Sequence, residues 1–359
     1  MRLTCALLGL LLLASEREGA CSLSLPQLVS VGHLGTARAL LTAQLHDHGF
    51  VRLLPTAGLA RDVVAVEAAA GQLFALDAAT KGHIDAAMRT HGRCDHRELQ
   101  LWCTGLRVNP AACSSAYKPD VQQHEQFHVV FDPTAIAAMA WPRETPALRR
   151  AVVRAGESLQ AVSESLLSAV APELLMLRAQ QVAARGNPSV LDLFQYHNCT
   201  GDCLEQQEGG RRMDSHVDPG IFTCKYIGAD QVSGLEVQDR QSGKWVGERA
   251  LGSTEAGGVG LEPIVLCFVN EALAEFTLAR PAALSGNYSS SSGSGSGSFY
   301  LTATPHRVVL APADPPRLSV VYEMRSPAFE LWDSLEEWSR AKREARRAEI
   351  RKSRRQQMP

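Results

Sequence analysis

The sequence predicts an α+β fold, in which a mainly helical N-terminal half is followed by a β-rich half. From about residue 28 to residue 184, apolar residues recur at helical spacing within Ala-, Leu- and Val-rich segments. From Val190 to Met324, short runs of β-branched and aromatic residues alternate with Gly and Pro turns. Several short strands at this spacing are typical of a sandwich or a barrel.

Composition sets the outer limits of this prediction. The chain has 359 residues, of which 45% are apolar and 21% charged, so it is long enough for one large or two ordinary domains with a sizeable core. The same composition excludes a disordered chain, a collagen and a multi-span membrane protein. The 36 Lys and Arg against 38 Asp and Glu give a formal net charge of −2, which argues against a globally basic nucleic-acid binder.

The helical half contains three segments that we expect to be helices and one that we expect to be a strand. Apolar residues at helical spacing occupy residues 34–45, and a strand-like run at residues 51–53 follows directly. Residues 62–76 and 145–185 are apolar and long enough for helices. We therefore predict that the N-terminal region, residues 28–185, is mainly helical.

The second half, residues 190–327, contains the predicted strands. They cover the runs Phe222 to Ile227, Gly234 to Gln238, Ile264 to Val269, His306 to Leu310 and Leu318 to Met324. This half also contains a Ser- and Gly-rich insertion, residues 281–300. Eight Ser and four Gly are among the fourteen residues from Ser285 to Ser298, and such a composition predicts a flexible segment with nothing to bury.

The first 20 residues have the features of a leader peptide. A short apolar run from Leu3 to Ala14 follows Met1 and Arg2, and small residues follow it; its length suits a signal peptide rather than a membrane span. We expect the protein to be located in the secretory pathway or a plastid, with a cytoplasmic location as the alternative. Loss of the leader would leave eight of the nine cysteines, an even number compatible with disulfides, although spacing alone assigns no pair.

The C-terminal residues, 328–359, predict a helix whose apolar stripe gives way to basic residues. From Arg340 to Pro359 there are nine Lys or Arg and two Asp or Glu, a local charge of +7 that leaves −9 on the rest of the chain. A basic helix of this kind can make weak contact with an anionic membrane surface, but such segments are more often solvated helix ends. We expect a monomer without a nucleic-acid partner.

The sharpest local signal for chemistry is His216-Val217-Asp218, which lies just before a predicted strand. On an extended strand, residues i and i+2 point to the same face, so this imidazole and carboxylate converge. A second histidine, His306, opens another predicted strand. Two His and one carboxylate that leave open coordination positions are the donor set with which non-haem Fe(II) binds a substrate and O₂ together.

A second pattern, Arg317-Leu318-Ser319, follows eleven residues after His306. On a strand, Arg317 and Ser319 share one face, and the alternate residues on the opposite face are apolar and predicted to pack in the core. A guanidinium beside a hydroxyl is a natural anchor for a carboxylate, because the Arg fork binds both oxygens. An iron site with such an anchor suits a 2-oxo acid, which chelates the metal at one end and is held at the other.

A rival motif is present at His124-Glu125-Gln126-Phe127-His128, which fits the H-E-x-x-H pattern of zinc proteases. That mechanism requires a helix, so that both His face one metal ion. Here Pro119 and Pro133 flank the motif, the residues after His128 read as a strand, and no convincing third ligand follows. The zinc protease stays as a remote alternative.

Taken together, these motifs resemble the isopenicillin N synthase-like family of Fe(II)/2-oxoglutarate-dependent dioxygenases. The resemblance extends over roughly residues 28–327 and is specific in the combination and order of its motifs. They are H-x-D-x-G-x-x-T at residues 216–223, G-L-x-V at 234–237, W-V at 245–246, T-x-H-R-V at 304–308 and R-x-S at 317–319. Weaker marks are L-x-L-x-x-Y-x-x-C at residues 191–199, Gly49-Phe50, and Glu125 to Phe127.

The resemblance implies a role for each motif residue. His216, Asp218 and His306 would ligate Fe(II), while Arg317 and Ser319, assisted by Tyr196, would hold the distal carboxylate of 2-oxoglutarate. The implied reaction consumes O₂ and 2-oxoglutarate, releases succinate and CO₂, and hydroxylates or desaturates a small organic substrate. The implied fold is a double-stranded β-helix (jelly roll) core with flanking helices, preceded by the mainly helical N-terminal region.

The sequence departs from the family pattern at three places. Phe194 stands where the family has Asn, and Asn270 stands where it usually has Gly. His306 follows His216 by 90 residues, a longer spacing than is usual, and the surplus falls in residues 251–260 and 281–300. Since a longer flexible loop adds little closure entropy, we expect surface insertions and an intact site. The alternatives are an oxidase that uses no oxoglutarate, or a binding module with a decayed site.

Overall fold

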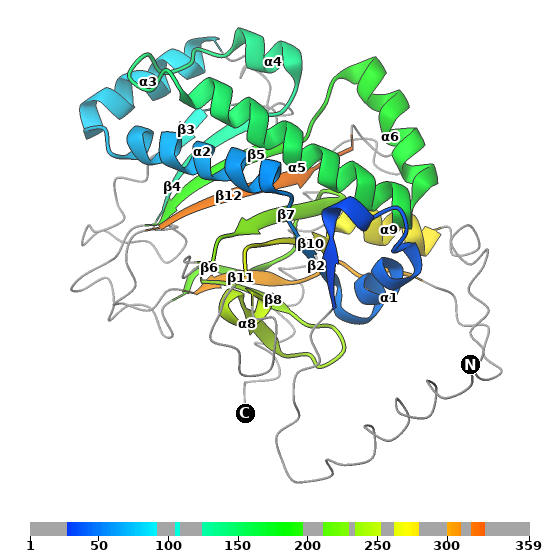
Figure 1. Cartoon of the computed structure of the whole chain (residues 1–359). Helices are drawn as coiled ribbons and strands as arrows, with labels where there is room; N and C mark the ends of the chain where they lie inside the picture. Colours follow the sequence, from blue (N-terminus) through cyan, green and yellow to red (C-terminus); the bar gives the residue numbers. More distant parts are fainter. Residues whose placement is uncertain are drawn as a thin grey trace, which may run out of the picture.

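The computed structural model describes residues 27–91, 105–107, 124–196, 211–229, 234–252, 262–279, 300–309 and 317–326. In these residues, a large and a small β-sheet lie on one side of a layer of helices, and the large sheet lies between the helices and the small sheet (Figure 1). The predicted leader, the Ser/Gly-rich run and the predicted C-terminal helix lie outside the described residues.

The large sheet has eight strands in the order β1-β2-β10-β7-β12-β5-β4-β3. All neighbouring pairs are antiparallel except β1 and β2, which are parallel. The strands are β1 (Leu28–Ser30), β2 (Phe50–Leu54), β3 (Gly105–Arg107), β4 (His124–Val130), β5 (Val190–Tyr196), β7 (Phe222–Ile227), β10 (Ile264–Val269) and β12 (Arg317–Met324).

The small sheet has four antiparallel strands in the order β6-β11-β8-β9. They are β6 (Arg211–His216), β8 (Leu235–Gln238), β9 (Trp245–Gly247) and β11 (His306–Val309). The small sheet lies on the side of the large sheet that is opposite the helix layer (Figure 1). Because residues of both sheets line one pocket, the two sheets face each other across it.

The helices are α1 (Arg38–His48), α2 (Ala57–Phe74), α3 (Ala78–His91), α4 (Pro133–Ala138), α5 (Leu148–Val170), α6 (Pro172–Arg185), α8 (Glu248–Gly252) and α9 (Glu271–Ala279). Helix α8 lies at the small sheet, where it contacts β9, and the outer layer is formed by the other helices (Figure 1). Helices α2 and α5 contact each other and pack on β12. Thr56 caps α2, since its hydroxyl accepts a hydrogen bond from the Leu59 amide at 3.2 Å. The helical segment predicted at residues 145–185 is divided before Pro172, which begins α6.

The main core lies between the helices and the large sheet. On β12, the predicted alternation is confirmed: Val320, Tyr322 and Met324 are fully buried in the cluster that packs against the helices. The same cluster contains Val51 of β2 and Phe127 of β4. The N-terminal region therefore contributes four strands to the sheet of the second half, in addition to its helices, and both halves share this core.

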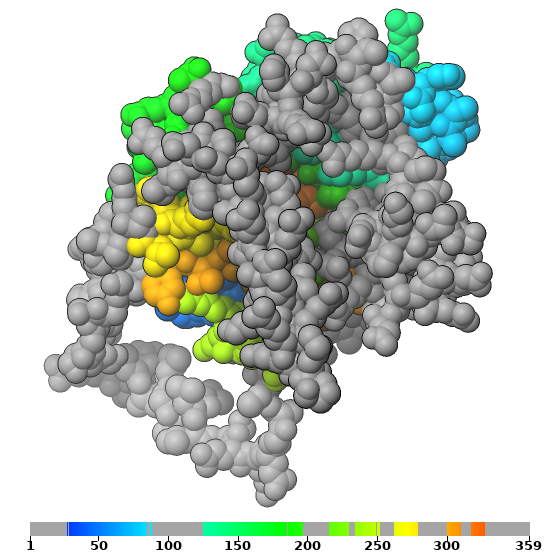
Figure 2. Space-filling model, turned by 180° about the vertical axis from the view of Figure 1, so that it is seen from behind, coloured from blue at the N-terminus to red at the C-terminus, as the bar shows by residue number. Residues whose placement is uncertain are grey.

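Two strands that are buried along their whole length have the predicted bounds. Phe222–Ile227 and Ile264–Val269 are strands β7 and β10, and every residue in them is buried. The sequence did not predict the three-residue strands β1 and β3, the polar strand β6 or helix α9. Seen from the opposite side, α9 and residues 300–309 are neighbours at the surface (Figure 2), where the Leu301 amide donates to the Thr277 hydroxyl at 2.9 Å.

One disulfide joins two adjacent strands of the large sheet. Cys224 of β7 and Cys267 of β10 are register partners with Cα atoms 4.2 Å apart, and both are fully buried. Spacing had assigned no pair, because the partners are 43 residues apart and are brought together by strand pairing. The other seven cysteines lie outside the described residues.

No single helix of the described residues is long and apolar enough to cross a membrane. Helices α2 and α3 would satisfy the length and composition requirement only as a pair that is bent by 112°. The apolar side of α2 packs in the core instead, where Val63, Val66 and Leu73 are fully buried.

Candidate functional site

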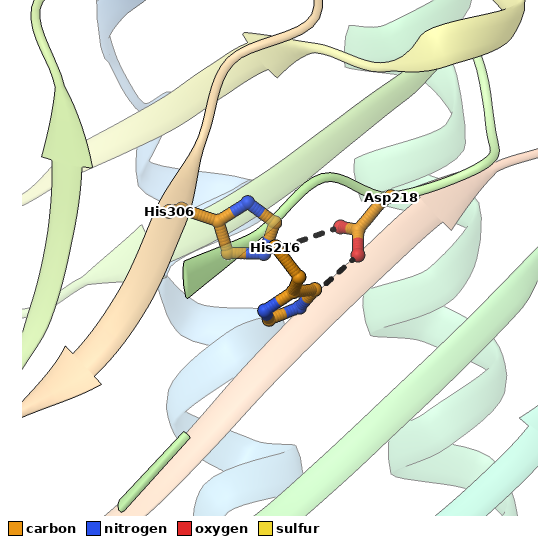
Figure 3. A group of neighbouring side chains, drawn as sticks. All are labelled: His216, Asp218 and His306. Carbon is orange, nitrogen blue, oxygen red and sulfur yellow. Dashed lines mark ion pairs between the residues drawn. The ribbon is translucent and has the colours of Figure 1, made fainter. Parts of the chain in front are cut away.

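His216, Asp218 and His306 lie together at one end of the space between the two sheets (Figure 3). The Asp218 carboxylate is between the two imidazoles: Oδ1 is 3.5 Å from His216 Nε2, and Oδ2 is 3.6 Å from His306 Nε2. One donor atom from each residue lies within 4.8 Å of the other two. A single metal ion can therefore contact all three side chains, as the sequence predicted.

Strand pairing brings the two histidines together. His216 is the last residue of β6 and pairs across the small sheet with His306, the first residue of β11, so their ring centroids are 4.2 Å apart. The expectation that His216 and Asp218 lie on one strand is wrong, because Asp218 belongs to the connection between β6 and β7. A turn directs the carboxylate instead, and the Asp218 carbonyl accepts a hydrogen bond from the Glu271 amide at 3.0 Å.

The turn after Asp218 explains a glycine of the motif. A Cβ atom on Gly220 would lie 2.6 Å from the Met324 carbonyl oxygen and 2.7 Å from a carboxylate oxygen of Glu323. The backbone is held close to β12 by a hydrogen bond from the Ile221 amide to the Met324 carbonyl at 2.7 Å. Only glycine fits at this approach, so the H-x-D-x-G spacing reflects how the turn packs on the large sheet.

The environment keeps His306 and Asp218 in the protonation states that metal binding needs. Burial lowers the pKa of His306 to about 4, although Asp218 opposes the shift, so the imidazole is neutral at pH 7. Its Nδ1 contacts the Thr304 carbonyl at 3.4 Å; if Nδ1 carries the proton, Nε2 has its lone pair toward Asp218. Burial by itself would raise the pKa of Asp218, but His306, His216 and Thr223 hold it well below its usual range. The donor set is chemically suited to Fe(II).

A hydrogen-bond chain that the sequence did not reveal supports Asp218. The Thr223 hydroxyl donates to Asp218 Oδ2 at 2.5 Å, and Asn270 Nδ2 donates to the Thr223 hydroxyl at 2.9 Å. The sequence singled out Asn270 only as a mild replacement for glycine. The structure instead gives its amide, fully buried at the end of β10, a part in orienting a metal ligand.

These residues open onto a pocket of about 110 Å³ between the two sheets. The large sheet contributes side chains from β5, β7, β10 and β12, and the small sheet contributes side chains from β6, β8 and β11. The wall consists of Asp192, Phe194, Tyr196, His216, Asp218, Thr223, Lys225, Leu235, Phe268, His306, Val308, Ser319, Val321 and Glu323.

The structure brings the predicted anchor residues together beside this pocket. Arg317 and Tyr196 are register partners on β12 and β5, and the guanidinium carbon lies 4.9 Å from the centroid of the Tyr196 ring. Ser319 and Tyr196 belong to the pocket wall, whereas Arg317 stacks on the Tyr196 ring. Burial raises the pKa of Tyr196, so its phenol stays protonated and can donate a hydrogen bond.

The wall also holds charged residues that the sequence did not single out. Lys225 of β7 pairs with Glu248, the first residue of α8, and both are buried. Burial lowers the pKa of Lys225, and Glu248 opposes that shift. The available signal was a lone charge within the apolar run Phe222–Ile227.

Two further carboxylates in the wall have partners of their own. Asp192 Oδ1 accepts from His128 Nδ1 at 2.6 Å and from Gln126 Nε2 at 2.7 Å, and Glu323 pairs with Arg325. His128 and Gln126 reach Asp192 from β4, the next strand of the large sheet. The carboxylates are therefore fixed in place rather than turned freely into the pocket.

The zinc-protease alternative fails on the secondary structure. Residues 124–130, which include the whole H-E-x-x-H motif, form strand β4 instead of a helix. Glu125 pairs with Lys81 at 2.5 Å, and His128 pairs with Asp192. The second histidine and the glutamate are thus engaged in separate contacts and do not form a metal site.

No protein-family model matches this sequence, and a comparison with curated proteins finds no match. Solved structures do match. A 2OG-Fe(II) oxygenase family protein of Caulobacter crescentus is 20% identical with a TM-score of 0.56, over 84% of this chain and 86% of that one. A Neurospora crassa protein in complex with alpha-KG and thymine is 16% identical with a TM-score of 0.57, over 84% and 85%.

The dioxygenase for auxin oxidation 1 of Arabidopsis thaliana, as its 2-oxoglutarate complex, is 12% identical with a TM-score of 0.53, over 84% of this chain and 93% of that one. At these identities the comparisons establish a shared fold. The predicted resemblance to Fe(II)/2-oxoglutarate oxygenases is confirmed at that level, and the His-Asp-His group occurs within the shared fold.

Proposed function

We propose that this protein is an Fe(II)- and 2-oxoglutarate-dependent dioxygenase that hydroxylates or desaturates a small organic substrate. The observation that carries the proposal is the convergence of His216, Asp218 and His306 on the pocket between the sheets. We interpret the two facing sheets as a double-stranded β-helix. The likeness to solved oxygenases supports this interpretation.

In this proposal His216, Asp218 and His306 hold Fe(II). When bound, the metal couples decarboxylation of 2-oxoglutarate, which yields succinate and CO₂, to oxidation of the substrate by O₂. The chain contributes the orientation of the donors: cross-strand pairing positions the two imidazoles, and the Asn270–Thr223 chain fixes the carboxylate. Phe268 packs on His306, with ring centroids 4.6 Å apart, and limits the access of water.

The co-substrate is anchored away from the metal. Ser319 and Tyr196 present hydroxyl donors to the pocket, and Arg317 adds positive charge behind the Tyr196 ring. A carboxylate there accepts hydrogen bonds from the two hydroxyls, and the positive charge of the nearby guanidinium attracts it. The 2-oxo acid group then extends toward His216, Asp218 and His306 at the other end of the same pocket.

The size of the pocket supports a small-molecule substrate, and a similar fold is known in complex with thymine. For location, we propose the secretory pathway or a plastid. The buried Cys224–Cys267 disulfide supports an oxidising compartment, because disulfides rarely persist in the cytosol.

Turnover of 2-oxoglutarate tests the proposal. Purified protein with Fe(II), O₂ and 2-oxoglutarate should release succinate and CO₂ slowly even without a prime substrate, and His216→Ala should abolish that release. His33→Ala is the control, since His33 is an exposed histidine outside the pocket. If the wild type releases no succinate with a broad set of candidate substrates, the chain is a binding module; release that survives His216→Ala would mean another site.

A further inference from the structure

One feature of the pocket is left unexplained by the proposed roles. Of the residues that the structure describes, Lys225 is the only Lys or Arg in the pocket wall. Arg317, which the sequence predicts as the anchor, is not part of the wall and stacks on Tyr196. The positive charge that directly faces the pocket therefore comes from a residue without an assigned role.

Lys225 lies on the correct side of the large sheet, next to the predicted anchor. It is the register partner of Val321 on β12, and Val321 is two residues from Ser319. Register partners and residues two apart on a strand share a face, so Lys225, Val321 and Ser319 point into the same space. All three are in the wall.

Glu248 fixes the direction of the lysine side chain. Glu248 follows β9 and begins α8, so the ion pair spans from the large sheet to the small sheet. The side chains of Lys225 and Glu248 are 5% and 0% exposed. A buried ion pair holds its geometry well but is not in itself stabilising relative to apolar residues of the same volume. This location calls for a reason other than packing.

We propose that Lys225, positioned by Glu248, binds the distal carboxylate of the 2-oxo-acid co-substrate together with Ser319 and Tyr196. The inference rests on the proposed function. The Lys225 ammonium has three donors, so it can serve Glu248 and a ligand carboxylate together.

The acidic residues Glu323 and Asp192 of the wall pair with residues other than Lys225. Glu323 is the register partner of Thr223, which supports the metal ligand Asp218, so Glu323 lies at the metal end and pairs with Arg325. Asp192 is held by His128 and Gln126. The positive charge of Lys225 is thus directed to the end of the pocket where the anchor lies.

A purely structural role is the competing explanation, and the chain offers a matched control for it. Lys81 and Glu125 form a second buried ion pair, with side chains 11% and 5% exposed, between α3 and β4. Neither belongs to the pocket wall. Removal of this pair tests what the loss of a buried Lys–Glu pair does without any effect on the pocket.

The test uses two double variants, Lys225→Met with Glu248→Met and Lys81→Met with Glu125→Met. Removing both partners avoids leaving an uncompensated buried charge, so both proteins should fold. Binding is measured anaerobically by calorimetry on the Fe(II)-loaded proteins with 2-oxoglutarate and with 2-oxovalerate. The second ligand keeps the oxo-acid end and has a methyl group in place of the distal carboxylate.

We expect the variant without Lys225 and Glu248 to bind 2-oxoglutarate about 10- to 100-fold more weakly, the loss of one charge-assisted hydrogen bond. Its affinity for 2-oxovalerate should be unchanged or higher. The variant without Lys81 and Glu125 should bind both ligands like the wild type. A fall in affinity for both ligands, or an equal fall in both variants, would show a structural role and overturn the inference.

The inference and the proposed function fail in different ways. If the wild type binds 2-oxoglutarate and the variant without Lys225 and Glu248 binds it equally well, only the role of Lys225 is refuted. If the Fe(II)-loaded wild type binds neither ligand, the proposed function is refuted, and the role of Lys225 with it.

Discussion

The two ends of the pocket are built in different ways. At the metal end, His216, Asp218 and His306 come from strand ends and a turn, and hydrogen bonds from neighbouring residues orient them. At the anchor end, a buried ion pair joins Lys225 of the large sheet to Glu248, the first residue of helix α8, which follows β9 of the small sheet. The metal end thus depends on local backbone geometry and short spacing, whereas the anchor end depends on how the sheets face each other.

This difference teaches which contacts a sequence exposes. Residues two apart on one strand, such as Arg317 and Ser319, share a direction whatever the rest of the fold does, and the short spacing of His216 and Asp218 keeps them close although Asp218 lies in the turn after β6. Glu248 is 23 residues from Lys225, and no periodicity relates them. Changes at the metal end should therefore affect metal binding, and changes at the anchor end should affect stability and co-substrate binding.

The largest effect is expected from His306→Ala. His306 is the most buried of the three proposed metal ligands, with a side chain 7% exposed, and its loss removes both a donor and the packing with Phe268. We expect Fe(II) affinity to fall by more than the roughly 10- to 100-fold typical for loss of a residue that only supports a ligand. Metal content after dialysis measures this, and a variant that retains one Fe(II) per chain would refute the assigned site.

At the anchor end, the single substitution Lys225→Met should destabilise the fold strongly. It leaves the Glu248 carboxylate buried without its cation, and breaking a buried pair costs about 3–5 kcal/mol. The double variant with Glu248→Met should recover most of that loss. The free energy of unfolding in urea measures both, and equal destabilisation of the single and the double variant would contradict the account.

Thr223→Val tests how the metal end is supported. It removes the donor to Asp218 and the acceptor for Asn270, so Fe(II) affinity should fall about 10- to 100-fold. Thr277→Val is the control, because Thr277 is also a buried, hydrogen-bonded threonine but lies outside the pocket wall. Titration with Fe(II) should show weaker metal binding by the Thr223→Val variant than by the Thr277→Val variant. Equal Fe(II) affinities of the two variants would mean that Thr223 does not orient Asp218.

The smallest effect is expected from Asp192→Asn and depends on pH. Burial alone would raise the pKa of Asp192, but His128 and Gln126 hold it below its usual range. Because its pKa is lower in the folded state, its stabilising contribution is present above the unfolded pKa of about 3.9 and is lost as pH falls through the folded value. At pH 7 the free energy of unfolding of the wild type should exceed that of the Asp192→Asn variant by about 1–3 kcal/mol.

Urea unfolding between pH 7 and pH 3 measures this prediction. The stabilities of the wild type and the Asp192→Asn variant should approach each other at the acidic end. A difference that stays constant over the whole range would show that the charge of Asp192 does not contribute.

The fold could be predicted where local sequence decides it. Strand β10 is a continuous apolar run, β7 is apolar except for Thr223 and Lys225, and the bounds of both were predicted. Strand β6 has the polar sequence Arg-Arg-Met-Asp-Ser-His and owes its conformation to pairing with β11, so no periodicity reveals it. Strand β4, which contains the H-E-x-x-H motif, is likewise fixed by its pairing with the neighbouring strands β3 and β5.

The candidate site divides in the same way. The metal donors and the residues Tyr196, Arg317 and Ser319 were predicted from motifs, and the structure brings them to one pocket or its border. Asn270 and Lys225 were not assigned a role, because their partners come from other strands or helices. The Cys224–Cys267 disulfide could not be predicted for the same reason, since its two cysteines lie on different strands.

Binding stoichiometry in the absence of O₂ tests the central claim most directly. Calorimetric titration of the metal-free protein should show that one Fe(II) binds per chain, that 2-oxoglutarate binds tightly only after Fe(II), and that His216→Ala abolishes both events. Binding of 2-oxoglutarate that is independent of the metal, or Fe(II) binding that survives His216→Ala, would contradict the assignment of one pocket to both ligands.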